Sequence, residues 1–191
     1  MEGQTMAEAA WRFDPVTLEE FQTMSFGDRK AELIDGLVVL AQAFPTSRHG
    51  DITGGVLVAL AGALRAGQRP CRAQTGTGLP IRLDRDYYLG PDVMVHCGGS
   101  RDAPGAPILV VEVLSPSNSA SEMMKKLRAY QAVGSIADIL FIDQDAYAVE
   151  HWTRDDRDAW TLSPRLSGAN AVLVLPRLGG EWPLEVLYGD A

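Results

Sequence analysis

Two acidic residues occupy positions where hydrocarbon side chains would be expected. Glu112 lies in the middle of the apolar run ILVVEVL, and Asp92 follows Pro91 at the start of the run DVMVHC. Burying an ionised carboxylate without a partner is strongly unfavourable, so each acid needs a hydrogen bond, a cation or a metal ion nearby. If the two strands are neighbours, both carboxylates lie at one end of a sheet and supply oxygen ligands for a hard divalent cation.

Both acids also have a structural interpretation. Asp92 at a strand entry would satisfy a turn, and for this residue taken alone the turn is the better interpretation. Glu112 would form a buried salt bridge, but the cost of burying its charge favours a functional role.

The expected cationic partner of Glu112 lies on the helix that follows its strand. Lys125 and Lys126 are both candidates. Lys126 shares a helix face with Tyr130 by i,i+4 spacing, whereas Lys125 shares one with Arg128. We therefore expect Lys126 to turn back over the strand; the alternative is a solvated lysine.

Two further polar residues are candidates for the same site. Glu32, in AELIDG, adjoins an apolar strand and is either a third carboxylate or an exposed edge residue. His49 opens a long predicted helix, where it would meet phosphate, water or a carboxylate, or simply stand at a helix start. The chain has no GK[ST] phosphate loop and no GxSxG elbow, so a metal is the only cofactor that the motifs suggest.

The elements that must position these residues follow from local patterns. TLEEFQTM predicts a short helix capped by Thr17 and Glu20, and Asp35-Gly36 predicts a hairpin inside KAELIDGLVVLAQ. A longer helix with one apolar stripe is predicted from the spacing of four residues: Ile52, Val56, Leu60 and Leu64.

The rest of the chain predicts mainly strands. CRAQT, GLPIRL, DVMVHC and ILVVEVL precede a helix that begins after Ser119, with Glu122 completing a second capping box and Gly134 closing the helix. DILFID, AYAVEHWT, AWTLSPRL, AVLVL and PLEVL complete the chain as β structure. The predicted fold class is α/β or α+β, with a mixed central sheet flanked by two principal helices and additional N- and C-terminal β structure.

Composition fits one globular domain over residues 1–191, since 46% of the residues are hydrophobic and 22% are charged. No apolar run has the length of a membrane span, and the acidic N-terminus does not resemble a signal peptide. We therefore expect a soluble, cytoplasmic protein. Cys71 and Cys97 have no metal-like spacing, which favours buried reduced thiols over a disulfide or a zinc site.

The charge pattern gives opposing indications about nucleic acid. A net charge of −8 and a pI near 4.8 argue against non-specific affinity for phosphate. Residues 52–83, however, contain no acid and four arginines: Arg65, Arg69, Arg72 and Arg82. These arginines form either a basic face or an ordinary solvated surface.

Five segments together resemble a known family. AELIDGLVV, SRHGDI, GPDVMV, LVVEVLSPS and KLRAY occur in the order seen in the Uma-type putative restriction endonucleases, a branch of the PD-(D/E)XK nuclease superfamily. The resemblance covers about residues 17–143, and residues 144–191 supply C-terminal strands of the same domain. The combination is more specific than any single segment.

This resemblance implies a restriction-endonuclease-like fold and Mg²⁺- or Mn²⁺-dependent hydrolysis of DNA by a homodimer. It assigns Lys126 as the catalytic lysine and His49 as an accessory residue, and it assigns as metal ligands Asp92, Glu112, the backbone carbonyl of Val113 and Glu32. Leu114 stands where the superfamily's E-x-K would place lysine, so the assignment depends on Lys126 reaching the acids. The alternative is a non-catalytic DNA- or protein-binding or dimerisation module that keeps the nuclease fold.

Overall fold

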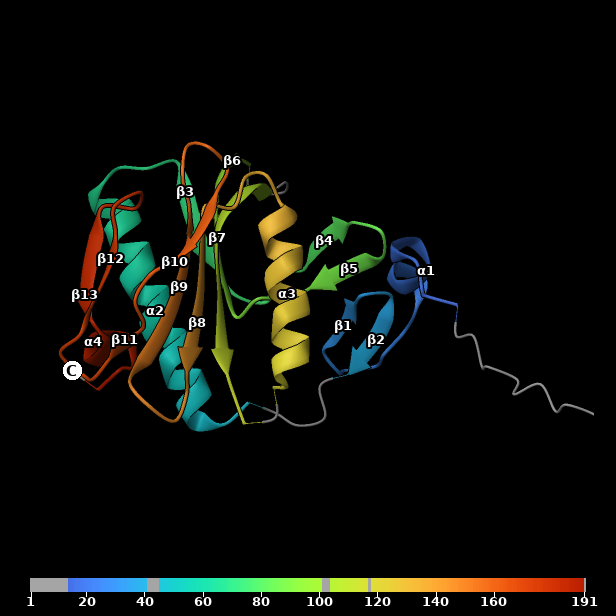
Figure 1. Ribbon diagram of the computed structural model, residues 1–191, viewed down its shortest axis with the longest axis horizontal. Coiled ribbons are helices and arrows are strands. Elements are labelled where there is room, and N and C mark those ends of the chain that lie inside the picture. Colours follow the sequence, from blue (N-terminus) through green and yellow to red (C-terminus); the bar gives the residue numbers. More distant parts are fainter. Residues whose placement is uncertain (1–13, 41–44, 101–103, 117, 191) are drawn as a thin grey trace, which may run out of the picture.

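The centre of the protein is a mixed sheet (Figure 1). The computed structural model describes residues 14–40, 45–100, 104–116 and 118–190. The strand order is β10-β9-β8-β7-β6-β3, with β11 beside β9. Only β7 and β8 pair in parallel among the described strands of this sheet. The strands are β3 (Cys71–Gln74), β6 (Val93–Gly99), β7 (Pro104–Leu114), β8 (Asp138–Asp143), β9 (Ala148–Arg154), β10 (Trp160–Leu162) and β11 (Leu166–Ser167). The predicted mixed central sheet is confirmed.

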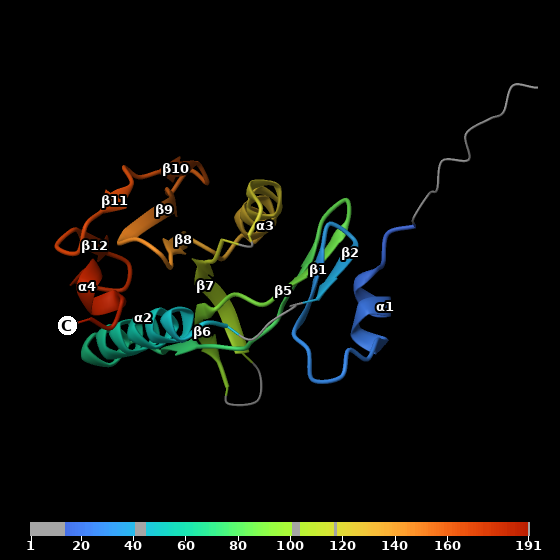
Figure 2. The same cartoon turned by 90° about the horizontal axis from the view of Figure 1, so that it is seen from below.

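The two principal helices cover opposite faces of this sheet, as Figure 2 shows. α2 (Ser47–Ala66) buries the predicted stripe of Ile52, Val56, Leu60 and Leu64 against one face. α3 (Ala120–Ala132) packs on the other face through Leu127, Ala129 and Tyr130. The Ser119 side chain accepts the Glu122 backbone N–H as expected, and Val133, just before Gly134, caps the end of α3.

A second, four-stranded sheet lies beside α3 and has the order β2-β1-β5-β4 (Figure 1). It is preceded by α1 (Leu18–Thr23), whose Thr17–Glu20 capping box is present as predicted. Its strands are β1 (Ala31–Ile34), β2 (Leu37–Leu40), β4 (Leu79–Arg82) and β5 (Asp86–Leu89). The turn between β1 and β2 has φ of 57° at Asp35 and 74° at Gly36, the left-handed conformation that this residue pair tolerates. The sequence interpretation had no strand at β5.

The C-terminal segment differs from the prediction. β12 (Val172–Leu175) pairs with β13 (Gly180–Pro183), and the PLEVL segment forms the short helix α4 (Leu184–Leu187) instead of a strand. Periodicity cannot separate helix from strand in so short an apolar run. Tertiary packing decides it, since α4 places Leu184 and Leu187 in the core on the α2 side of the sheet.

The prediction of two separate thiols is wrong, because Cys71 and Cys97 form a disulfide. Their separation of 26 residues gives no local signal. The antiparallel register of β3 and β6 places them directly opposite each other. None of the described helices combines the length and apolar character needed to cross a membrane.

Candidate active site

Glu112 lies at the centre of a buried ionic network between β7, β1 and α3. The Lys126 Nζ atom lies 3.2 and 3.4 Å from the two carboxylate oxygens of Glu112, and 2.7 Å from Oε2 of Glu32. All three residues are buried, with 4% of Lys126 and 6% of Glu112 exposed. α3 and β1 lie side by side in both views, which explains how Lys126 reaches both acids (Figures 1 and 2).

Tyr130 adds a hydrogen bond to this network. Its hydroxyl donates to Glu112 Oε1 at 2.5 Å, and its side chain is fully buried. Lys126 and Tyr130 are one helical turn apart, so the same face of α3 presents an ammonium and a hydroxyl to one carboxylate. Lys126 and Tyr130, the predicted i,i+4 pair, therefore both contact Glu112.

Asp92 forms a second group just before β6. Its Oδ2 accepts the backbone N–H of Val113 at 2.8 Å, and its Oδ1 lies 3.2 Å from Nε2 of His49. Lys30 Nζ lies 3.9 Å from Oδ1 and also donates to the carbonyl of Gly90. Because Val113 follows Glu112 in β7, the backbone connects the Asp92 group directly to the buried network.

The two acids have opposite ionisation behaviour. Burial raises the pKa of Glu112 to about 7, because desolvation outweighs the positive charge of Lys126, and the carboxylates of Glu32 and Asp92 add to the rise. Burial also opposes ionisation of Asp92, but the hydrogen bonds with His49 and the Val113 N–H hold its pKa below the ordinary value. For Lys126, the carboxylates of Glu112 and Glu32 outweigh burial and raise the pKa, so the ammonium stays charged.

These charges fit a divalent cation. Three carboxylates share the region with one buried ammonium. Burial is the main cause of the raised pKa of Glu112, and the negative charges of Glu32 and Asp92 add to it. Glu32 is already bound, since Oε1 accepts the Gly90 N–H at 2.7 Å and Oε2 meets Lys126. Within the described part of the chain, no three His, Cys, Asp or Glu side chains stand together as a ready ligand set. The oxygens of Asp92 and Glu112 also have partners, but the Val113 N–H joins these two acids at one place. They are the candidate ligands, and Mg²⁺ needs few protein carboxylates because it keeps several waters.

The structure thus places the five candidate residues in two adjoining groups: Glu32, Glu112 and Lys126 in one, and Asp92 with His49 in the other. Two contributors were not proposed from the sequence. Tyr130 was noted only as the neighbour of Lys126, although the same spacing predicts that it faces Glu112. Lys30 gave no signal at all, because its contact with Asp92 depends on how the β1 hairpin packs against the Gly90 turn.

Two known proteins are similar to this chain. A putative nuclease from Anabaena variabilis, of known crystal structure, has the same fold with a TM-score of 0.71; the match covers 92% of this chain and 99% of that one at 19% identity. An uncharacterized protein of Synechocystis, sll1609, is 33% identical over 94 residues, which are 46% of this chain and 52% of the relative. The chain thus spans about half the length of that curated relative.

The sequence pattern of one family matches residues 18–186 and extends beyond the segment expected from the motifs alone. It includes all five candidate residues and the C-terminal strands. The chain belongs to the Uma2 family, described as putative restriction endonucleases.

Proposed function

We propose that the protein is a metal-dependent endonuclease that hydrolyses phosphodiester bonds in DNA. The observation that carries this proposal is the position of Lys126. Leu114 leaves no lysine on the strand itself, yet the Lys126 ammonium is buried between Glu32 and Glu112. Acids that could hold a metal ion, with a positive charge beside them, are groups that can stabilise the charge developing in phosphoryl transfer. This supports placing the chain in the PD-(D/E)XK superfamily.

Each residue has a role in this proposal. Mg²⁺ or Mn²⁺, held by Asp92, Glu112 and the Val113 carbonyl, would supply positive charge to the phosphoryl group. Lys126 orients the attacking water and offsets charge that develops on the phosphate. Glu32 holds Lys126 in place.

The remaining contacts orient the two metal-binding acids. The Tyr130 hydroxyl fixes Oε1 of Glu112, while Oε2 lies 3.4 Å from the Lys126 ammonium. The hydrogen bond with His49 fixes Asp92. These contacts support a pre-organised site.

The test is a nuclease assay with a matched control on the same helix. Wild type, Glu112→Gln, Lys126→Ala and Lys125→Ala would be incubated with single-stranded, double-stranded and branched DNA and with RNA, each with Mg²⁺ and with Mn²⁺. Lys125 is the control because its ammonium pairs with Asp35, 3.0 Å away, outside the network. We expect Lys126→Ala to lower the cleavage rate about a hundredfold and Lys125→Ala to leave it unchanged.

The outcomes separate the enzyme from a contaminant and from the alternative function. Equal cleavage by all four proteins would indicate a contaminating nuclease. Absence of cleavage on every substrate, with DNA or protein binding intact, would favour the non-catalytic binding module. The acidic composition is the observation that favours this alternative.

Three further properties belong to the same proposal. We propose one domain, because the cores on the two faces take alternating residues from the same two strands, β6 and β7. We also propose a cytoplasmic location, from composition, and a homodimer, since paired subunits can cut both strands. Light scattering after gel filtration tests the homodimer, and a monomer at about micromolar concentration would contradict it.

A further inference from the structure

A basic pocket lies at the β3 edge of the central sheet. It is a shallow cavity of about 290 Å³ between the C-terminal turns of α2 and the edge strand β3. Its polar lining comes from five residues: Arg65, Gln68, Arg69, Arg72 and Gln74. The lining contains no acid, so the pocket carries three positive charges in a chain whose net charge is −8.

The arginines of this pocket are available for a ligand. Among the described residues, Arg65, Arg69 and Arg72 have no carboxylate within ion-pairing distance, whereas Arg48 and Arg82 each pair with an acid. Arg65 and Arg72 are both exposed. An exposed guanidinium with no carboxylate beside it offers planar N–H donors that match phosphate oxygens.

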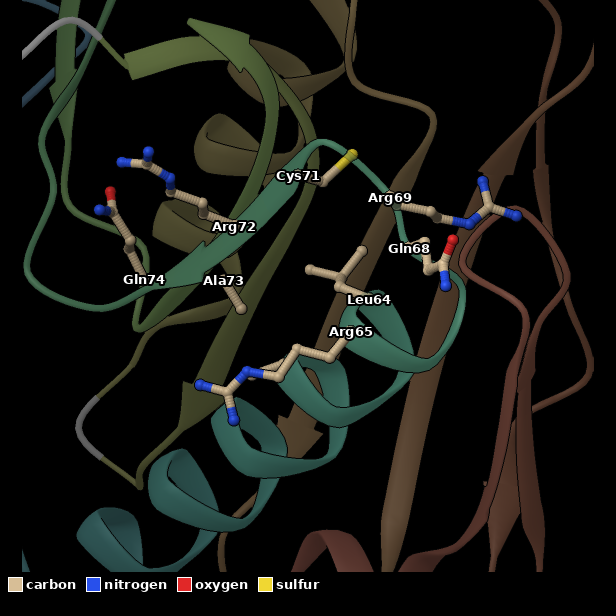
Figure 3. A pocket seen from close by; sticks show the side chains of 9 residues that line it. Leu64, Arg65, Gln68, Arg69, Cys71, Arg72, Ala73 and Gln74 are labelled. Atoms are coloured by element: carbon tan, nitrogen blue, oxygen red, sulfur yellow. The ribbon is translucent and has the colours of Figure 1, made fainter. Parts of the chain in front are cut away.

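The arginine side chains do not all point the same way. Figure 3 shows Arg65 extending from α2, on the side of β3 to which Ala73 points, and Arg72 extending from the other side of β3. Cys71 and Ala73 pack against the core on the α2 side, so Arg72 lies on the opposite face of the sheet. Arg69 extends away from both arginines. Arg65 and Arg72 therefore lie on the two sides of the edge strand β3, and a duplex lying along this edge would contact both.

Both walls of the pocket lead to the candidate active site. α2 begins beside Asp92 with His49, and at 1.5 Å per residue Arg65 lies roughly 24 Å farther along the helix. Arg72 on β3 stands opposite His96 on β6 in the strand register. His96 follows Asp92 by four residues, which is roughly 13 Å at 3.3 Å per residue of strand. Because B-DNA rises about 3.4 Å per phosphate of one strand, these distances correspond to about seven and about four base pairs.

We propose that Arg65 and Arg72 bind the sugar–phosphate backbone of the DNA duplex several base pairs away from the bond that is cut. This inference rests on the proposed function. The pocket anchors the flanking duplex, since phosphate contacts fix the position of a protein on DNA without reading its sequence. It also explains how an acidic protein binds a polyanion, because the positive charge is concentrated along one path.

The test measures binding separately from cleavage. Fluorescence anisotropy with labelled duplexes of about 8 and about 30 base pairs would be recorded in EDTA over a range of salt concentrations. The proteins are wild type, Arg65→Gln, Arg72→Gln, the double variant, and the double Arg→Lys variant that keeps both charges. Arg157→Gln is the matched control, because Arg157 is exposed, has no ion pair within the described residues and follows β9 on the far side of the sheet.

We expect each Arg→Gln change to reduce the slope of log affinity against log salt by about 0.9, and the double variant by about twice that amount. Both duplexes should show the loss, because about eight base pairs already span the path of about seven base pairs from Asp92 to Arg65. Arg157→Gln and the double lysine variant should keep the slope of wild type.

Other outcomes overturn the inference. An unchanged slope in both Arg→Gln variants of a protein that still cleaves DNA would refute it and leave the proposed function standing. Arginine-dependent binding by a protein that never cleaves would support the inference while the proposed hydrolysis fails. Refutation would also follow if wild type bound no duplex; arginine-dependent binding of inorganic phosphate by that protein would then indicate a small-anion site.

Discussion

The ionisation of Glu112 should be visible as a pH dependence of stability. Its pKa is about 7 in the folded protein, against an ordinary value of 4.5. Between these values the folded protein keeps a proton that the unfolded chain has released, so the free energy of unfolding falls as pH rises. At about 1.4 kcal/mol per pKa unit, the total decrease is about 3 kcal/mol.

The perturbation is Glu112→Gln, which removes the titrating group but keeps the shape of the side chain. Urea unfolding of wild type and variant would be measured from about pH 4.5 to about pH 8. The difference between them cancels the contributions of other groups. We expect the variant to gain about 3 kcal/mol relative to wild type across this interval, with most of the change complete at about pH 7.

A divalent cation should remove this pH dependence. If Glu112 is a ligand, bound Mg²⁺ favours the carboxylate, so the decrease in wild-type stability becomes smaller when Mg²⁺ is added. The Gln variant should show no such response. A stability difference that does not vary with pH would refute the argument, because it would mean that Lys126 and Tyr130 fully compensate the burial of Glu112.

Three other predictions test the surrounding contacts. Tyr130→Phe should destabilise the protein by about 1.5–3 kcal/mol in urea unfolding, because it removes a hydrogen bond to a buried charged group. Mn²⁺ should raise the melting temperature of wild type but not of Asp92→Ala; equal binding of both in titration calorimetry would remove Asp92 from the site. Reducing the Cys71–Cys97 disulfide should lower the free energy of unfolding by about 3 kcal/mol, from the loop of 26 residues that it closes. Identical denaturation curves with and without reductant would contradict this last prediction.

Elements that depend on neighbouring residues were predictable from the sequence. The Thr17–Glu20 capping box and the Asp35-Gly36 turn are formed by contacts within four positions, so their residue types specify them. The stripe of α2 depends only on helical periodicity, and its members are all buried. Errors occurred where local preference is weak, as in PLEVL, which forms α4 because its leucines fit the core.

For the candidate active site, residue types and spacing alone indicate that Glu112 needs a positively charged partner and that Lys126 and Tyr130 share a helix face. The tertiary structure decided which atoms meet: β1 brings Glu32 to Lys126, the Val113 N–H binds Asp92, and the β3–β6 register joins the two cysteines. These contacts join residues from separate elements, and the packing of those elements sets the distances. A local sequence pattern is enough to show that a buried charge needs compensation, because the cost of burial depends on the residue type. The position of the compensating charge depends on the whole fold.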